Sequence, residues 1–156
     1  MGTRPLAELL AEWRAAERRW ERPAPASDIQ AAALNVIGSW VAYQDAALPA
    51  ESGEFMLVAD DDRQYVGVTG AVTRVLGYEP GEIIGKRIED LAHPEQAAAT
   101  AAEWQEFLEE GRRDGLFVLR AKDGRAVSCV YQARAHHPVP GFHMSRLWVD
   151  PQASVG

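Results

Sequence analysis

The sequence is short of cysteine, of long apolar runs and of positive charge. Its single cysteine, Cys129, excludes an internal disulfide framework and a cysteine-rich zinc site. No apolar run approaches the roughly 20 residues that a membrane-spanning helix needs, and the first residues lack the charged start and apolar middle of a secretion signal. We therefore expect a soluble, cytoplasmic protein with no membrane association.

Acidic side chains outnumber basic ones, 23 against 16, which gives a net charge of −7. Nucleic-acid binding draws most of its affinity from clustered basic side chains that displace counterions from phosphates. The local basic groups, Arg14 with Arg18 and Arg19 and then Arg112 with Arg113, stand among glutamates. We therefore expect no direct binding to nucleic acid.

What the sequence does contain is an ordinary globular composition. An apolar share of 47% over 156 residues is enough to build one domain with some added helix, without metals or disulfides. Changes of pattern along the chain divide it into three parts. We expect a helical hairpin in residues 1–50, a mixed domain in residues 51–150 and a flexible tail in residues 151–156.

Two amphipathic patterns predict the helical hairpin. In residues 5–22 the apolar side chains recur at spacings of three and four, which places them on one helical face. Pro23 and Pro25 end this helix, and a second helix begins at Ser27 and is closed by Pro49. Its tryptophans are costly to leave in water, so the hairpin either covers the sheet or binds a second protomer. The residues expected to form this interaction surface are Leu6, Leu9, Trp13, Trp20 and Trp40.

Short apolar runs separated by turns predict strands from Phe55 onward. Two strands come first, a mainly helical stretch follows up to about Arg113, and three further strands end the domain. An Asp123-Gly124 dipeptide suits the tight turn between two of them. Strands grouped at both ends around helices predict an α+β domain with one antiparallel sheet. The expected strands are residues 55–59, 64–68, 116–120, 126–135 and 142–149.

This order of elements, together with one segment, resembles the PAS family. In residues 66–86 a strand leads into a short helix that ends in leucine-glycine-tyrosine at 76–78, and a second short helix ends in glycine-lysine at 85–86. The turn at 122–125 fits the same pattern. The similarity runs from 55 to 149 and implies a five-stranded antiparallel sheet with helices on one face, here preceded by the helical hairpin.

Several residues of the matching segment have a physical reason. Gly77 and Gly85 stand where helix ends favour a left-handed residue, and Leu76 and Ile84 are expected to bury the short helices against the sheet. One position departs from the pattern, because Thr69 stands where the family commonly has asparagine. Threonine can still cap a helix, so the fold is expected to hold, whereas an asparagine-dependent relay is not.

The resemblance implies a pocket between the sheet and the helices. On the strand at 126–135, Val127, Cys129, Tyr131 and Ala133 share one face, and their character indicates that it points inward. Tyr131 would offer one oriented hydroxyl. The space either holds a small, mostly apolar ligand or is filled by side chains. The residues expected to line it are Leu57, Trp104, Phe107, Val118, Cys129, Tyr131 and Leu147, with Phe55 and Leu116 beside them.

Two cofactors known from the family are disfavoured. A flavin photoadduct would need a cysteine in the helical stretch, whereas Cys129 lies on a strand. Haem needs an axial ligand, and the long helix expected at 94–111 contains no histidine. His93 precedes that helix and is expected to be a helix-entry or surface residue. We therefore expect no cofactor.

The remaining histidines suggest a dianion or metal site only superficially. His143 alternates with other residues that could face inward on the last strand, so it either faces the pocket or is a solvent-facing or otherwise satisfied histidine. His136 and His137 are neighbours, and adjacent strand residues point to opposite faces. A joint metal site is therefore disfavoured.

No nucleophile with a base, carboxylate pair or metal set has the spacing that catalysis needs, so we expect no enzyme. Two functions stay open. The first is a sensory module in which a small ligand acts through the N-terminal helices. The second is a ligand-free dimerisation or adaptor module for a partner signalling protein. Both include a homodimer, and either an unidentified partner supplies the output or the chain is a fragment of a longer protein.

Overall fold

The computed structural model describes residues 4–20, 26–48 and 53–151, with the side chains of 19–20 and 26–30 left out. Residues 152–156 of the tail expected at 151–156 and the helix-ending prolines 23, 25 and 49 lie outside the described residues. The elements are α1 (Leu6–Trp20), α2 (Ala26–Ala47), β1 (Phe55–Asp60), β2 (Tyr65–Val68), α3 (Val72–Leu76), α4 (Pro80–Ile83), α5 (Ile88–Leu91), α6 (Pro94–Glu110), β3 (Arg112–Arg120), β4 (Ala126–Arg134) and β5 (Phe142–Val149).

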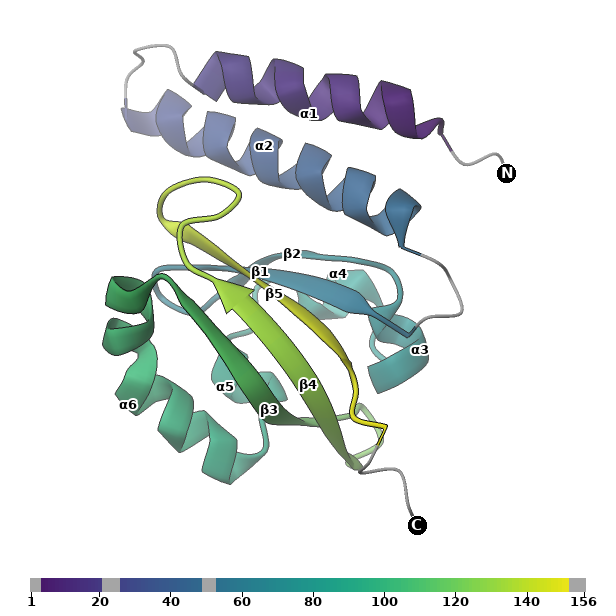
Figure 1. Cartoon of the computed structure of the whole chain (residues 1–156), viewed down its shortest axis with the longest axis vertical. Coiled ribbons are helices and arrows are strands. Elements are labelled where there is room, and N and C mark those ends of the chain that lie inside the picture. Colours follow the sequence, from purple (N-terminus) through teal and green to yellow (C-terminus); the bar gives the residue numbers. More distant parts are fainter. Residues whose placement is uncertain (1–3, 21–25, 49–52, 152–156) are drawn as a thin grey trace.

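The five strands form one antiparallel sheet in the order β2-β1-β5-β4-β3 (Figure 1). The prediction of an α+β fold with a five-stranded sheet and an N-terminal helical hairpin is therefore confirmed. β3 begins at Arg112 rather than at Leu116. The reason is Gly111, which ends α6 in a left-handed conformation with φ of 86° and turns the chain directly into the strand.

Helices α3 to α6 cover one face of the sheet, which we call the inner face. Leu76 of α3, Ile83 of α4 and Leu91 of α5 are fully buried against Phe55 and Leu57 of β1. The expectation that Ile84 buries α4 was wrong, because Ile84 is 46% exposed. Helix α4 is a single turn that presents one side chain to the sheet, and Ile84 is its extended C-cap residue.

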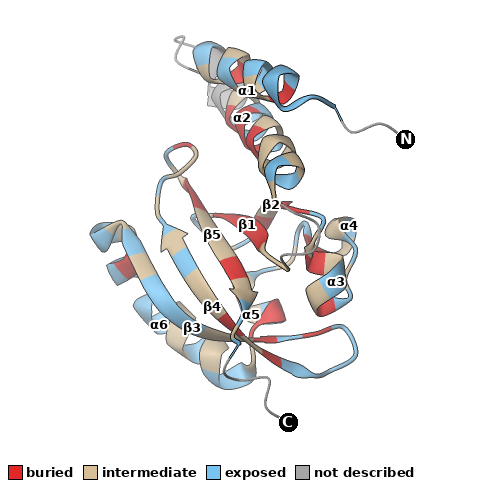
Figure 2. Cartoon of the chain, turned by 45° about the vertical axis from the view of Figure 1, so that its right-hand side comes forward, coloured by how far each residue is buried: buried red, intermediate tan, exposed pale blue. Residues whose placement is uncertain are grey.

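The helical hairpin lies on the other side, which we call the outer face. Figure 2 shows buried positions along α2 and through β1 and β5. Trp40 and Ile37 of α2 pack against Met56 and Val58 of β1. Helix α2 packs closely over Gly67 of β2, where an added Cβ would lie 2.9 Å from Val41 Cγ2 and 3.2 Å from Ile37 Cγ2.

Two polar contacts and one loop fasten this arrangement. The Asp45 carboxylate of α2 accepts the N–H of Gly70 at 2.8 Å. Thr69 does not cap α3 as expected, because its buried hydroxyl instead accepts the N–H of Met56 at 2.9 Å. In the β4–β5 loop, Val139 is buried in the cluster formed by the hairpin and the outer face.

Across the three described segments, no helix combines the length and the apolar character that crossing a membrane would require.

Candidate functional site

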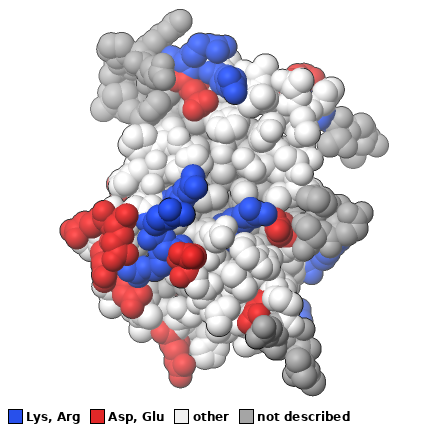
Figure 3. All heavy atoms as spheres, in the orientation of Figure 1, with Lys and Arg blue, Asp and Glu red and all other residues white. Residues whose placement is uncertain are grey.

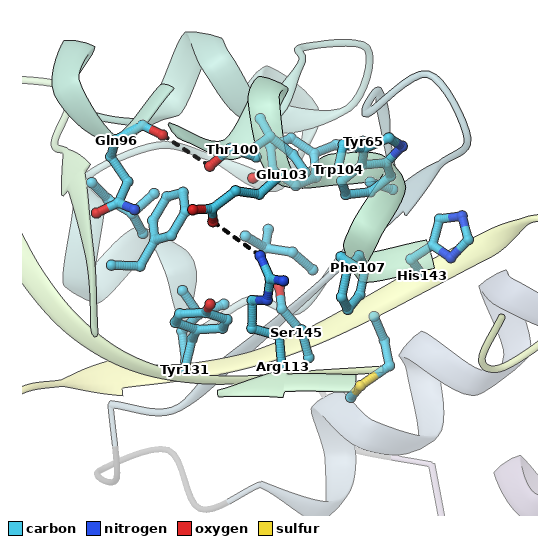
Figure 4. Close-up of a pocket in the computed structure, with 18 residues that line it drawn as sticks. Tyr65, Gln96, Thr100, Glu103, Trp104, Phe107, Arg113, Tyr131, His143 and Ser145 are labelled. Atoms are coloured by element: carbon cyan, nitrogen blue, oxygen red, sulfur yellow. Dashed lines mark hydrogen bonds and ion pairs between the residues drawn. The ribbon is translucent and has the colours of Figure 1, made fainter. Parts of the chain in front are cut away.

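A cavity of about 100 Å³ lies between α6 and the inner face of the sheet (Figure 4). Leu57, Phe117, Leu119 and Leu147 supply its apolar surface from β1, β3 and β5. Helix α6 presents Trp104 and Phe107, whose ring centroids are 5.4 Å apart. The polar side chains around the cavity are Gln96, Thr100, Glu103, Arg113, Tyr131, His143 and Ser145.

The structure brings most of the expected pocket residues together. Leu57, Trp104, Phe107, Tyr131 and Leu147 all line this cavity. Trp104 is held in place because its indole N–H donates to the carbonyl of Asp61 at 2.9 Å. The aromatic wall of the cavity is therefore fixed to the β1–β2 turn.

Two expected pocket residues on β3, Val118 and Leu116, do not line the cavity. Leu116 is 59% exposed, and it is Phe117 and Leu119 that point inward. Directly paired residues of antiparallel strands point to the same face. Phe117 pairs with Cys129, and Leu119 pairs with Val127. Because Cys129 and Val127 belong to the inner core cluster, Phe117 and Leu119 face inward with them, and Leu116 and Val118 face the other side.

Cys129 also lies beside the cavity rather than at it. Its side chain is fully buried in the core cluster with Phe55, Leu119 and Leu147. Burial raises the pKa of the Cys129 thiol to about 11. The thiol is therefore protonated near neutral pH, as expected of a buried cysteine among apolar neighbours.

An ion pair at the edge of the cavity was not predicted from the sequence. Arg113 of β3 donates to the Glu103 carboxylate of α6 at 2.9 Å and to Glu110 at 3.2 Å. Figure 4 shows Arg113 and Glu103 reaching toward each other across the space. The side chains are 23% and 56% exposed, which places the pair where the cavity meets solvent. Three glutamates, at positions 103, 106 and 110, recur at helical spacing just before Arg113. This spacing is the sequence feature from which an ion pair with Arg113 could have been predicted.

Two further polar groups connect the helix to the strands. The Gln96 side-chain carbonyl accepts the N–H of Val118 at 3.3 Å, and the Thr100 hydroxyl donates to the carbonyl of Gln96 at 2.9 Å. Tyr131 packs edge-on against Phe117 with ring centroids 5.7 Å apart. Burial raises the pKa of Tyr131, so its hydroxyl stays a neutral donor.

His143 lines the cavity, and both of its ring nitrogens already have partners. The N–H of His136 donates to Nδ1 at 2.9 Å, so the proton sits on Nε2, which donates to the Asp61 carboxylate at 2.8 Å. Burial lowers the pKa of His143, against the opposing effect of Asp61. The His143 ring is thus neutral, and both of its nitrogens are hydrogen-bonded. It packs edge-on against the Trp104 ring, with ring centroids 5.4 Å apart.

The other histidines occupy separate environments. His136 and His137 follow the end of β4 and are not strand residues. His136 Nδ1 accepts the N–H of Gly141 at 3.0 Å, and His137 meets the edge of Trp40 at 5.9 Å. His93 is the N-cap residue of α6. Within the described segments, no three His, Cys, Asp or Glu residues converge as metal ligands would.

The expected interaction residues are mostly occupied within the chain. Leu9 and Trp40 are buried, and Trp13 is partly buried with its ring 5.7 Å from Tyr43, so none of the three is free to meet a partner fully. Trp40 packs against the sheet, which was the other expectation for the hairpin. Leu6 remains 45% exposed. The side chain of Trp20 is outside the described residues.

Comparisons with known proteins agree with this geometry. A family model described as the PAS fold matches residues 65–139. None of the curated proteins compared with the sequence matches it.

Solved structures provide the second comparison. A PAS domain from Colwellia psychrerythraea superposes with a TM-score of 0.59 at 15% identity, covering 70% of this chain and 96% of that one. The PAS domain of an HTR-like protein from Haloarcula marismortui gives 0.60 at 17% identity, covering 72% and 93%. The Cycle PAS-B domain of Drosophila melanogaster with bound ethylene glycol gives 0.55 at 19%, covering 62% and 99%.

At identities of 15–19% the structural similarity shows the fold alone. The family model shows in addition that the sequence of residues 65–139 fits the PAS fold. The five-stranded sheet, the inner helices and both comparisons lead to one conclusion. The chain contains a PAS domain, a kind of domain that is generally a sensory and signalling module.

Proposed function

We propose that this chain is a sensory module whose cavity binds a small, mostly apolar molecule and whose helical hairpin transmits the occupancy. The observation that carries the proposal is the cavity of about 100 Å³ lined by Leu57, Trp104, Phe107 and Leu147. An apolar cavity of roughly 150 Å³ is known to hold benzene. The cavity here is smaller, so it suits a ligand no larger than benzene.

The polar rim supports a ligand with one hydrogen-bonding group. The neutral Tyr131 hydroxyl and the Arg113–Glu103 pair stand at one side of the space, and most of the remaining lining residues are apolar. A few oriented polar groups on an apolar wall are typical of small-molecule sites. We propose that Arg113 and Glu103 separate when a ligand enters.

The sheet itself supplies a route to the hairpin. Alternate residues of β1 face opposite sides, so Leu57 lines the cavity while Met56 and Val58 pack on α2. β5 repeats the pattern, with His143 at the cavity and Phe142 in the outer cluster. Because packed interiors transmit small displacements, a ligand that shifts either strand also shifts the base of the hairpin.

The test is an NMR titration of the whole chain with benzene and with the smaller pyrrole, which carries one N–H donor, beside native mass spectrometry of freshly purified protein. We expect amide shifts confined at first to α6 and the inner face and then extending to α2. Ala133→Leu, which places extra atoms in the cavity, should abolish them. A clean apo mass together with no shift at saturating probe would contradict ligand sensing.

A ligand-free adaptor or dimerisation module is the second candidate. The observation in its favour is an apolar row across the uncovered part of the outer face, formed by Leu116, Val130 and Trp148 in register. Leu116 is 59% exposed, and Leu6 and Leu34 of the hairpin are also exposed. Sedimentation at increasing concentration would show a dimer, and Leu116→Glu should dissociate it if this row is the contact.

A further inference from the structure

A second concave site lies on the outer face, across the sheet from the ligand cavity. It is a cleft of about 280 Å³ between α2 and the strands β3, β4 and β5. Trp40 and Gln44, one helical turn apart, form its helical wall, and His137 of the β4–β5 loop adds to it. The hairpin and the sheet therefore both contribute to this cleft.

Three arginines from three neighbouring strands converge in the cleft. Arg112 of β3 pairs directly with Arg134 of β4, and Arg146 of β5 pairs with Gln132, two residues from Arg134. Figure 3 shows Lys and Arg side chains gathered over these strands beside the acidic side of the molecule. Such clustering stands out in a chain with a net charge of −7.

The direct pairing of Arg112 with Arg134 across the sheet is unfavourable by itself. Like charges directly across a sheet destabilise it. The glutamates of α6 that lie nearest in sequence bind Arg113, whose side chain points to the inner face. Within residues 4–20, 26–48 and 53–151, no carboxylate forms an ion pair with Arg112 or Arg134, and both residues are exposed.

The other charged groups of the cleft do not cancel the excess, and the charge of Arg113 is already paired with glutamates of α6. Arg146 donates to the Glu54 carboxylate at 2.6 Å and lies over the Trp148 ring at 5.7 Å, so it is already oriented. Asp114 also lines the cleft and offsets one positive charge. Because Glu54 and Asp114 together offset two of the three positive charges of Arg112, Arg134 and Arg146, the cleft keeps a positive balance.

We propose that this cleft is a binding site for a compact polyanion, either a phosphate ester or a polycarboxylate, held chiefly by Arg112 and Arg134. Planar guanidinium groups bind both kinds of anion through paired hydrogen bonds. The volume suits a small molecule, and the Gln44 amide supplies a donor from α2. Bound there, the anion relieves the arginine repulsion and ties the hairpin to the sheet.

The direct experiment titrates the whole chain with pyrophosphate and with citrate at constant ionic strength set by sodium chloride, followed by calorimetry and NMR. We expect saturable binding with amide shifts at Arg112, Arg134 and Gln44. Pyrophosphate alone would identify phosphate chemistry, and equal binding of citrate would identify a general polyanion site. Absence of saturation for both anions, or shifts that centre elsewhere, overturns the proposal.

Matched charge variants distinguish a specific anion site in the cleft from a general attraction between anions and basic side chains. Arg112→Gln and Arg134→Gln should each weaken binding roughly tenfold or more, because each removes charge-assisted hydrogen bonds. Arg120→Gln is the control, since Arg120 ends the same strand about 26 Å away at roughly 3.3 Å per residue. If Arg120→Gln weakens binding as much, the attraction is diffuse and the site is refuted.

Thermal unfolding gives a readout that a folding defect cannot imitate. Without polyanion, Arg134→Gln should leave the melting temperature unchanged or raise it, because it removes a like-charge pair. With pyrophosphate, the unsubstituted chain should gain stability while the variant gains much less. A variant that is destabilised without anion contradicts the proposed repulsion and with it the reason for the site.

Discussion

The fold opposes the ionisation of His143. This histidine is buried 5.4 Å from Trp104 and 6.2 Å from Phe107 by ring centroids, and burial lowers its pKa. Asp61 acts in the opposite direction and His136 in the same one. The folded chain therefore binds the proton less readily than the unfolded chain does, so stability falls on acidification below the ordinary histidine pKa of about 6.5.

The free energy of unfolding should accordingly decrease between pH 7 and pH 5, as measured by urea denaturation. His143→Gln removes this titration and should flatten the curve. A remaining slope is expected from His137, whose pKa burial also lowers. A variant with the same pH dependence as the unsubstituted chain would show that His143 is not the responsible group.

Two glycines test how closely α2 approaches the sheet. Gly67→Ala places a methyl 2.9 Å from Val41 Cγ2, and such overpacking costs about 1–3 kcal/mol. Gly38→Ala is the control, because its Cβ would meet nothing within 4 Å and alanine favours a helix by about 1 kcal/mol. Denaturation of both variants should give shifts of opposite sign, and two equal shifts would contradict the described contact.

At the scale of elements, the sequence determined type and order better than orientation. Alternating and helical patterns predicted the five strands and the long helix, because each period is repeated several times. Orientation failed where neighbouring residues are equally apolar. Ile83 and Ile84 are identical, and Leu116 to Leu119 are apolar on both faces of β3, so only packing could decide which side is buried.

The polar rim of the cavity was harder still to predict. Arg113 and Glu103 lie on different elements, and their contact depends on how α6 folds back over β3. His143 and Asp61 are 82 residues apart and meet through the pairing of β1 with β5. Local patterns carry no information about such distances.

Strand β3 offers a direct test of that register. Phe117→Ala removes a ring from the cavity wall and should cost about 2–3 kcal/mol, somewhat below the range for a fully buried phenylalanine. Leu116→Ala, one residue away on the exposed side, should stay within about 0.5 kcal/mol. Denaturation of the two variants shows which residues of β3 face the cavity. A larger cost for Leu116→Ala than for Phe117→Ala would mean that Leu116 points inward.

At the scale of the whole molecule, the sheet is a single layer shared by two packed faces. The inner cluster contains Phe55 and Leu57, and the outer cluster contains Met56 and Val58. Successive residues of one strand therefore belong to different cores. Loss of packing on the outer face should be felt on the inner face, which is the physical requirement for transmission between hairpin and cavity.

Trp40→Ala tests this coupling, because Trp40 is 2% exposed and joins α2 to β1 and to the β4–β5 loop. The truncation should cost about 3–5 kcal/mol and speed amide exchange in β1 and β5 as well as in α2. Trp148→Ala is the matched control, because Trp148 lies on the same face but is only partly buried. If the faster exchange stays within α1 and α2, the two faces are energetically independent, and the hairpin cannot report on the cavity through the sheet.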